Sequence, residues 1–462
     1  MLSRRRFLAS LAASVGLSPA IASARAEPRV CVPVPPLGEP WSYAQAHTLA
    51  VRTNTWVPEL PPPQLPWTPP ILPAFDPAKT GATLRQRFPE LRQHFVFEYY
   101  PWYSTDPWWH WNQWQRVPPF DIAATSVPRL GPYDSRDAKV VEQHARWILD
   151  AGVGAINLSW WGRGSFEDQR VPLVMDVMRD HGLKVTFHLE PYDTQRTERY
   201  ADDIRYLLTE YGEKRRWDCW LMLDDADGVE GPVFKSFATI LPAQGTDCHG
   251  RTFPVDLYRP DSVWRQQTDA VRETFRHDFD QIVLLADSSA LDRLRAAGFD
   301  GMAIYDNYVR PAQWPHMAID CRNFGVEFSF NINAGFDSIA QRNVPPDSCY
   351  RPPRFEPPAV LDWSAARDRE LAQQLAEWRI DESMRTTLNL QTDRFLPPAK
   401  TGFFLTYINS FNEWHEGTQF EPMKDAAMLT AEEAPFGYHN AVDGGYRLAY
   451  LRSRLQPILA PQ

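Results

Sequence analysis

The sequence predicts an α/β protein: a single (β/α)8 barrel of the TIM type with long loops, preceded by a proline-rich arm. From about residue 90, eight short apolar runs alternate with eight helical patterns, as such a barrel requires. A doubly wound open sheet is the alternative, but no glycine-rich nucleotide loop follows the first run. Of the 462 residues 44% are hydrophobic and 23% charged, which excludes a disordered chain and a membrane bundle.

The first 90 residues are predicted to lie outside the barrel. Residues 1–26 contain SRRRFL, an apolar run of small residues and A-x-A sites, which together are typical of a twin-arginine export signal. We therefore expect a periplasmic or secreted protein, and no other apolar run is long enough to span a membrane. Residues 27–90 are predicted to form an extended arm, because residues 28–77 contain 14 of the 42 prolines. The barrel domain is then residues 91–462.

The expected barrel strands are apolar runs of strand length, and the expected helices show apolar residues three and four positions apart. The runs cover residues 94–100, 153–160, 183–190, 219–224, 281–287, 300–306, 326–333 and 402–409. The helical patterns cover residues 135–151, 167–181, 195–211, 261–277, 289–297, 312–323, 363–391 and 444–456.

Polar and aromatic side chains follow every run, and a barrel gathers these carboxyl ends at one face, where barrel enzymes have their active sites. Aromatic faces with carboxylates and amides suit a sugar, whose C–H faces stack on rings and whose hydroxyls need short polar partners. The net charge of −10 argues against a partner bound by neutralising phosphates, such as a nucleic acid. We expect an oligosaccharide or polysaccharide substrate.

Residues 102–114 contain five tryptophans, too many for an exposed loop that binds nothing. Two interpretations are open: a platform for sugars, or a surface that packs against the proline-rich arm.

Glu413 and Glu416 are the candidate catalytic pair. They lie three residues apart directly after the eighth run, and glycoside hydrolysis generally requires two carboxyl groups on one bond. The spacing alone has little weight, since helix surfaces often carry it. The neighbouring residues Trp414, His415 and Gly417 are poor choices for a solvated helix face, however, and favour a buried site.

The segment FNEWHEGTQFEP at residues 411–422 closely resembles the signature of glycoside hydrolase family 99, the endo-α-mannosidases and endo-α-mannanases. The resemblance recurs in order at YYPWY (99–103), GPYDS (131–135), AGVG (151–154), SWWG (159–162), GLKVTFHLEPY (182–192) and GFDG (298–301). It implies a (β/α)8 barrel, no metal or cofactor, and cleavage within α-mannosides with retention of configuration.

The resemblance also implies roles for residues. Glu413 corresponds to the general base, which deprotonates the substrate's own 2-hydroxyl to close a 1,2-anhydro sugar, and Glu416 to the general acid. Residues expected to bind substrate are Tyr100, Tyr103, Trp161, His188, Glu190, Tyr192, Tyr305, Asn412 and Trp414. Trp161 should contact the sugar one subsite further out, Tyr305 is a weaker match, and His188 is also interpretable as a structural hydrogen-bonding residue.

The sequence departs from the family at Glu98, where an aromatic or aliphatic residue is usual, at residues 331–337, and in an insertion at 226–260. Three other functions stay open. One is a related barrel enzyme that trims an exported polysaccharide of other sugars, and another is a non-catalytic carbohydrate-binding protein. The third is a metal hydrolase that uses His188 and Glu190 with Asp224, Asp225 and Asp227.

Overall fold

The computed structural model describes residues 69–460, except residues 73, 215–216, 247–251, 306, 308, 340–356 and 358–360. The predicted export signal and residues 27–68 of the predicted arm lie outside the described residues. The last part of that arm was predicted wrongly, because it forms the helix α3 (Pro77–Arg87). Pro77 stands in the first turn, where its missing N–H is not needed, and Asp76 accepts a hydrogen bond of 3.0 Å from the Lys79 backbone N–H.

Parallel strands form the barrel wall and close on themselves. In sheet order they are β1 (Phe95–Tyr99), β4 (Ala155–Trp160), β5 (Lys184–Leu189), β7 (Glu230–Ser236), β10 (Val283–Ala286), β11 (Gly301–Ala303), β12 (Glu327–Ser329), β13 (Ile332–Asn333) and β14 (Thr406–Asn409). Only Phe330 and Asn331 separate β12 from β13, so these segments are one interrupted strand. Because β12 pairs with β11 and β13 pairs with β14, the predicted eight-stranded barrel is confirmed.

The fourth barrel strand is not the predicted one. Residues 219–224 contribute β6 (Met222–Asp224), which pairs antiparallel with the start of β7. The barrel strand is β7, inside the segment that we had interpreted as an insertion, and it pairs in parallel with β5 and β10. Lys235 interrupts the apolar run of β7, although its side chain is completely buried. The sequence did not indicate this strand, because a lysine is almost never buried without a partner and therefore does not suggest a core strand.

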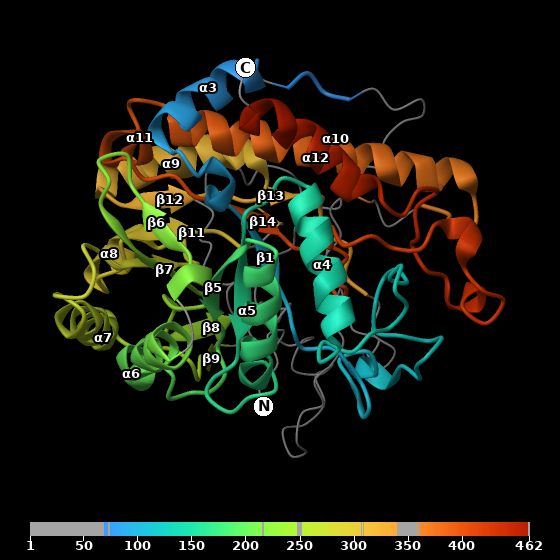
Figure 1. The fold of residues 1–462 in the computed structure, drawn as a ribbon, viewed down its shortest axis with the longest axis horizontal. Helices are drawn as coiled ribbons and strands as arrows, with labels where there is room; N and C mark the ends of the chain where they lie inside the picture. Colours follow the sequence, from blue (N-terminus) through green and yellow to red (C-terminus); the bar gives the residue numbers. More distant parts are fainter. Residues whose placement is uncertain are drawn as a thin grey trace.

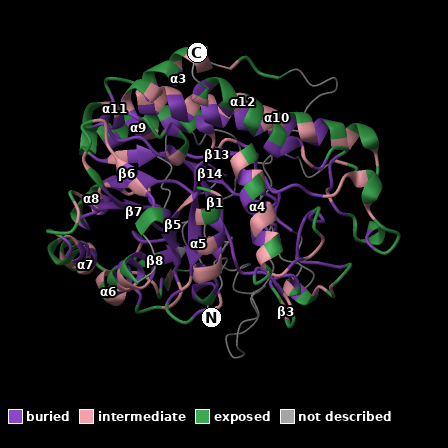
Figure 2. Cartoon of the chain, viewed as in Figure 1, coloured by how far each residue is buried: buried purple, intermediate pink, exposed green. Residues whose placement is uncertain are grey.

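The helices follow the predicted patterns closely. They are α4 (Ala138–Asp150), α5 (Val171–Asp180), α6 (Tyr200–Leu207), α7 (Asp261–Thr274), α8 (Leu291–Ala296), α9 (Trp314–Phe324), α10 (Ala366–Thr392), α11 (Pro397–Thr401) and α12 (Tyr446–Leu459). In α4 the buried residues Val141, Ala145 and Ile148 lie on one face, as an amphipathic helix requires. Helices surround the sheet, with α3 and α12 packed together along one side of the barrel (Figure 1). Buried residues fill the strands and the inner helix faces (Figure 2).

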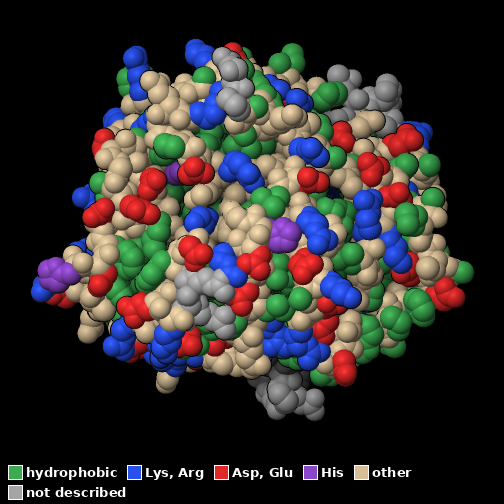
Figure 3. Space-filling model, in the orientation of Figure 1, with side chains coloured by type: hydrophobic (Ala, Val, Ile, Leu, Met, Phe, Trp, Pro, Cys, Tyr) green, Lys and Arg blue, Asp and Glu red, His purple; other side chains and the backbone are tan. Residues whose placement is uncertain are grey.

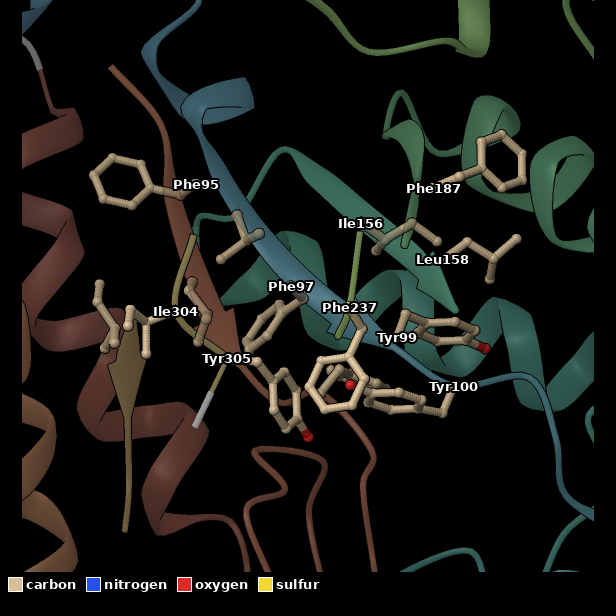
Figure 4. Close-up of a cluster of buried hydrophobic side chains, with 14 of the residues drawn as sticks. Phe95, Phe97, Tyr99, Tyr100, Ile156, Leu158, Phe187, Phe237, Ile304 and Tyr305 are labelled. Atoms are coloured by element: carbon tan, nitrogen blue, oxygen red, sulfur yellow. The ribbon is translucent and has the colours of Figure 1, made fainter. Parts of the chain in front are cut away.

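The alternation of each strand gives the barrel two different surfaces. Outward side chains of β1, such as Phe95, Phe97 and Tyr99, belong to the large aromatic cluster between sheet and helices (Figure 4). Inward side chains toward the amino-terminal ends form a separate apolar layer of Val96, Ala155, Val233, Val283, Leu285, Ala303 and Leu405. Two residues further along four of these strands the inward layer is polar, with Glu98, Asn157, Lys235 and Tyr407. The barrel interior thus changes from apolar to polar toward the carboxyl ends.

On the face shown in Figure 3, acidic and basic side chains are interspersed over the surface. Within the described residues, none of the helices is both long enough and apolar enough to cross a membrane.

Candidate active site

The loop after β14 carries both candidate catalytic glutamates. Its ends are joined by backbone hydrogen bonds, of which Ser410 N–H to the Thr418 carbonyl (3.0 Å) is one. A further bond of 2.7 Å runs from the Phe411 N–H to the Glu98 carbonyl and ties the loop to β1. The side chains of Glu413 and Glu416 are 1% and 2% exposed. The loop therefore holds two buried carboxyl groups at the carboxyl ends of the strands.

Glu416 is bound by a tyrosine from the end of another strand, β11, which lies two positions away from β14 in the barrel. The hydroxyl of Tyr305, which follows β11, donates a hydrogen bond of 2.9 Å to Glu416 Oε2. The Tyr305 ring packs against Phe237 with ring centres 5.7 Å apart, and both rings lie together near the strand ends in Figure 4. This phenol stabilises the ionised form of Glu416, which is the form that a general acid reaches after it gives up its proton.

Glu413 is held by its own loop. The backbone N–H of His415 donates to Glu413 Oε1 at 3.1 Å, and the Glu413 N–H donates to Ser410 Oγ at 2.8 Å. Tyr103 lies nearby: burial and the charge of Glu413 raise the pKa of its phenol well above the usual range. The hydroxyl of Tyr103 donates to the Asn412 carbonyl and accepts from the Trp414 N–H, both at 3.1 Å. Tyr103 thus fixes the backbone on both sides of Glu413.

The tryptophan-rich segment packs on this loop. The Trp102 ring stacks on His110 at 4.5 Å, and His110 stacks on His415 at 5.5 Å. The Trp114 ring meets His415 edge-on at 4.9 Å, while Trp109 remains 39% exposed. Most of this segment therefore packs against the loop after β14 that contains NEWHE at residues 412–416, which we call the NEWHE loop. Neither of our two interpretations included this role. Contact with the arm before residue 69 lies outside the described residues.

Glu190 and Trp161 are linked through Ser159. Ser159 Oγ donates to Glu190 Oε1 at 2.8 Å and accepts from the Trp161 indole N–H at 3.2 Å. The Trp161 ring lies 6.4 Å from Trp102. The hydroxyl of Tyr192 instead donates to Asp203 on α6. Burial together with Asp203 raises the pKa of this phenol. Substrate contact by Tyr192 stays a prediction.

Asn412 and Trp414 make internal contacts. The amide of Asn412 bonds both the N–H (2.8 Å) and the carbonyl (2.9 Å) of Tyr100, and the Trp414 indole donates to Glu421 Oε2 at 2.9 Å. Asn412 thereby holds the backbone of Tyr100, a buried residue whose ring stacks on Trp102 at 4.6 Å. These bonds explain why an amide and an indole occur here, and direct contact of either side chain with substrate stays a prediction.

The chain has relatives in a known family. The model for glycosyl hydrolase family 99 matches residues 90–217. Over 378 residues the chain is 25% identical to glycoprotein endo-alpha-1,2-mannosidase of Mus musculus, covering 75% of this chain and 71% of the mouse protein. The Xenopus laevis protein of the same name is 25% identical over 385 residues, covering 76% and 75% of the two chains. Both comparisons therefore confirm the resemblance to glycosyl hydrolase family 99 that the sequence predicted.

A solved structure supports the fold of the chain. The GH99 endo-alpha-mannosidase from Bacteroides thetaiotaomicron aligns with a TM-score of 0.54 and 21% identity, over 79% of this chain and 97% of that chain. The barrel seen here therefore has the same fold as that solved barrel, and the predicted fold class is confirmed. The protein is a glycoside hydrolase.

Sequence reasoning missed the polar layer beneath the candidate active site. Glu98 Oε1 accepts from Lys235 Nζ at 2.7 Å, and Glu98 Oε2 lies 2.9 Å from His188 Nδ1. Burial opposes ionisation of Glu98, but His188 and Lys235 outweigh it and lower the pKa to about 2. The departure at Glu98 therefore has its partner in Lys235. The only signal in the sequence was the pair of charges inside two apolar runs.

The amino-terminal end of the barrel contains a separate cavity of about 650 Å³. It is lined by Asp225, Asp300 and Glu327, and burial raises the pKa of Glu327 to about 7. Asp225 follows β6, so Asp224 and Asp225 lie at the amino-terminal end of β7, and their predicted place beside His188 was wrong. Among the described residues, no three or more His, Cys, Asp or Glu side chains are grouped to hold a metal ion.

Proposed function

We propose that this protein is a retaining, endo-acting α-mannosidase that cleaves internal α-mannosidic bonds of a glycan or polysaccharide through a 1,2-anhydro sugar. One observation carries this proposal: Glu413 and Glu416 are both buried on one loop, and each is held by a different set of donors. Two carboxyl groups in unlike surroundings suit the two unlike tasks of base and acid. The names of the mouse and Bacteroides relatives supply the sugar and the endo action.

In the first step, Glu413 takes the proton of the 2-hydroxyl of the mannose whose bond is cleaved. The freed O2 attacks C1 and forms the 1,2-anhydro ring while the bond from C1 to the leaving oxygen breaks. In α-mannose the 2-hydroxyl and the leaving group are axial on opposite faces, so O2 is placed for backside attack. Glu416 gives its proton to the leaving oxygen, and the Tyr305 hydroxyl stabilises the carboxylate that results.

In the second step, water opens the anhydro ring at C1. Glu416 now accepts a proton from the water, and Glu413 returns its proton to O2. Two inversions at C1 give overall retention of configuration. An α-glucoside carries its 2-hydroxyl on the wrong face for the first step, so this mechanism itself selects the manno configuration.

We also propose that the enzyme acts beyond the inner membrane. The support is the arginine-rich, apolar and A-x-A pattern of residues 1–26. A fusion of these residues to a reporter that is active only after export would test this. Loss of export when Arg4, Arg5 and Arg6 are replaced by lysine would support a twin-arginine signal.

The main test is product analysis. The enzyme is incubated separately with α-mannan, glucosylated high-mannose glycan and a bacterial exopolysaccharide, and the products are separated by chromatography. Release of a disaccharide or longer oligosaccharide, first seen as the α-anomer by NMR, is expected for α-mannan or the high-mannose glycan. Release of monosaccharide alone contradicts endo action, and turnover of the exopolysaccharide alone contradicts the mannose specificity. A 2-deoxy substrate analogue should resist cleavage because it lacks the internal nucleophile.

A further inference from the structure

The carboxylate of Glu98 connects residues from three other strands in the barrel interior. Its Oε2 atom accepts a hydrogen bond of 3.0 Å from the Asn157 amide and lies 2.9 Å from His188 Nδ1, while its Oε1 atom accepts from Lys235 at 2.7 Å. All four side chains are fully buried. A buried ion pair of this kind rarely adds to stability compared with apolar side chains of similar volume, so its presence calls for another reason.

These contacts fix the proton on His188. An ionised carboxylate only accepts hydrogen bonds, so Nδ1 of His188 must carry the proton that points to Glu98. Lys235 already neutralises Glu98, which leaves no need for a second buried cation on the imidazole. In a neutral His188 with this proton on Nδ1, the Nε2 atom is a hydrogen-bond acceptor. That atom is buried and has no hydrogen-bond partner in the described part of the chain.

The position of His188 directs this acceptor toward the site. His188 is two residues before Glu190, so both side chains point to the same side of the sheet, with Glu190 nearer the carboxyl end. Its ring centre lies 6.0 Å from that of Tyr305, whose hydroxyl holds Glu416. The Phe237 ring lies 5.8 Å away on a third side. His188 therefore lies directly below the residues expected to surround the cleaved sugar.

We propose that the Glu98–Lys235 pair is a positioning unit, which holds His188 as the Nδ1–H form so that Nε2 accepts a hydrogen bond from a hydroxyl of the bound sugar. The inference rests on the proposed glycosidase function for its ligand. Glu98 and Lys235 do not touch the substrate and act through His188 alone.

Two double variants separate this role from packing. In Glu98→Gln/Lys235→Met both charges disappear together, so no uncompensated ion is buried. The amide of Asn157 keeps the glutamine oxygen on the side of His188, because it can donate only to that atom. In Glu98→Leu/Lys235→Met the acceptor for His188 is lost as well. The first variant should keep kcat/KM on α-mannan within about threefold of wild type. The second should lose about 10- to 100-fold in kcat/KM, mainly through kcat, because it lacks the contact that positions His188.

The protonation state of the His188 imidazole can also be measured directly. This measurement keeps the proposal testable if one of the variants folds poorly. Nitrogen-15 NMR of histidine-labelled wild-type enzyme should show His188 as the neutral Nδ1–H form, assigned by its absence in His188→Gln. The Glu98→Gln/Lys235→Met variant should keep that signature, and Glu98→Leu/Lys235→Met should lose it. An imidazolium or an Nε2–H form in wild type overturns the proposal.

Two kinetic outcomes also overturn it. Equal activity of the two double variants, at matched melting temperatures, would mean that the hydrogen bond to His188 is unimportant. Activity near wild type in Glu98→Leu/Lys235→Met would assign the pair to packing. The NMR measurement needs no substrate, so it decides the state of His188 even when α-mannan is not cleaved. Failure of the wild type on every α-mannoside would count against the proposed function instead.

Discussion

The two ends of the barrel both carry carboxyl groups, which are fully buried at the carboxyl end and half-buried at the amino-terminal end. At the carboxyl end, Glu416 accepts a hydrogen bond from Tyr305 on another element, and Glu413 accepts one within its own loop. At the amino-terminal end, Glu327 lies beside a cavity of about 650 Å³, and burial raises its pKa to about 7. In this protein, neither the cavity nor the raised pKa of Glu327 indicates where the active site lies. What distinguishes the active end is that several loops converge on the same two carboxyl groups.

The largest expected effect separates the two glutamates by their dependence on the leaving group. Glu416→Gln should lose at least about 10²-fold in kcat/KM on a natural glycoside, a typical contribution of a general acid. It should largely recover on an α-mannosyl fluoride disaccharide, because fluoride leaves without a proton. Glu413→Gln should stay inactive on both substrates, since the 2-hydroxyl still needs a base.

The control for this experiment is Glu327→Gln, which changes a half-buried glutamate at the other end of the barrel. It should keep normal turnover of both substrates. Recovery of Glu413→Gln on the fluoride would reverse the assigned roles. Natural turnover within a few-fold of wild type in both active-end variants would place the site elsewhere.

The next effect concerns the bond between Tyr305 and Glu416. Tyr305→Phe removes a hydrogen bond to a carboxylate, which is worth about 1.5–3 kcal/mol, so kcat should fall about 10- to 100-fold. The carboxylate form of Glu416 becomes less stable, so the alkaline limb of the pH profile of kcat/KM should move to higher pH. Tyr407→Phe is the control, because the buried Tyr407 hydroxyl makes no hydrogen bond in the described structure. An unmoved limb in Tyr305→Phe contradicts the role given to Tyr305.

A smaller change is expected at Trp161, at the edge of the active end. Trp161→Tyr should alter the ratio of kcat/KM between mannose- and glucose-terminated substrates by about 1–3 kcal/mol, the scale of one altered pocket contact. The tyrosine also loses the indole bond to Ser159, which in turn holds Glu190. Ser159→Ala controls for that loss. Equal slowing of both substrates would assign Trp161 to packing.

The smallest effect should appear at the amino-terminal end and only in stability. Because folding raises the pKa of Glu327 to about 7, the folded state binds this proton more tightly than the unfolded state. The stabilisation is complete below the unfolded pKa of about 4.5 and is lost as the pH rises through about 7. Glu327→Gln should therefore gain about 1 kcal/mol relative to wild type between pH 5 and pH 8, measured by urea unfolding. A pH-independent difference contradicts this reading.

The comparison also shows what the sequence could predict. The apolar run at residues 94–100 predicted β1 well. Its outward-facing aromatic residues are typical of a strand, and this pattern does not depend on which side chains point into the barrel. The same reasoning failed for β7, since Lys235 reads as a surface residue until its partner is known. That partner, Glu98, is 137 positions away in the sequence. Glu413 and Glu416 could be proposed from the sequence because they share one short motif. The stack of Trp102, His110 and His415 instead depends on a loop conformation that no local pattern encodes.

The NEWHE loop is joined to two neighbouring segments by main-chain hydrogen bonds. Asp337 N–H donates to the Glu416 carbonyl at 2.8 Å and Ile339 N–H to the His415 carbonyl at 3.0 Å, while Thr125 N–H donates to the Trp414 carbonyl at 3.3 Å. The conformational entropy of this loop is therefore lost when the protein folds, before any glycan arrives. Binding then requires little ordering of the enzyme around the reacting bond, so a slow closing step is not expected in the approach to turnover.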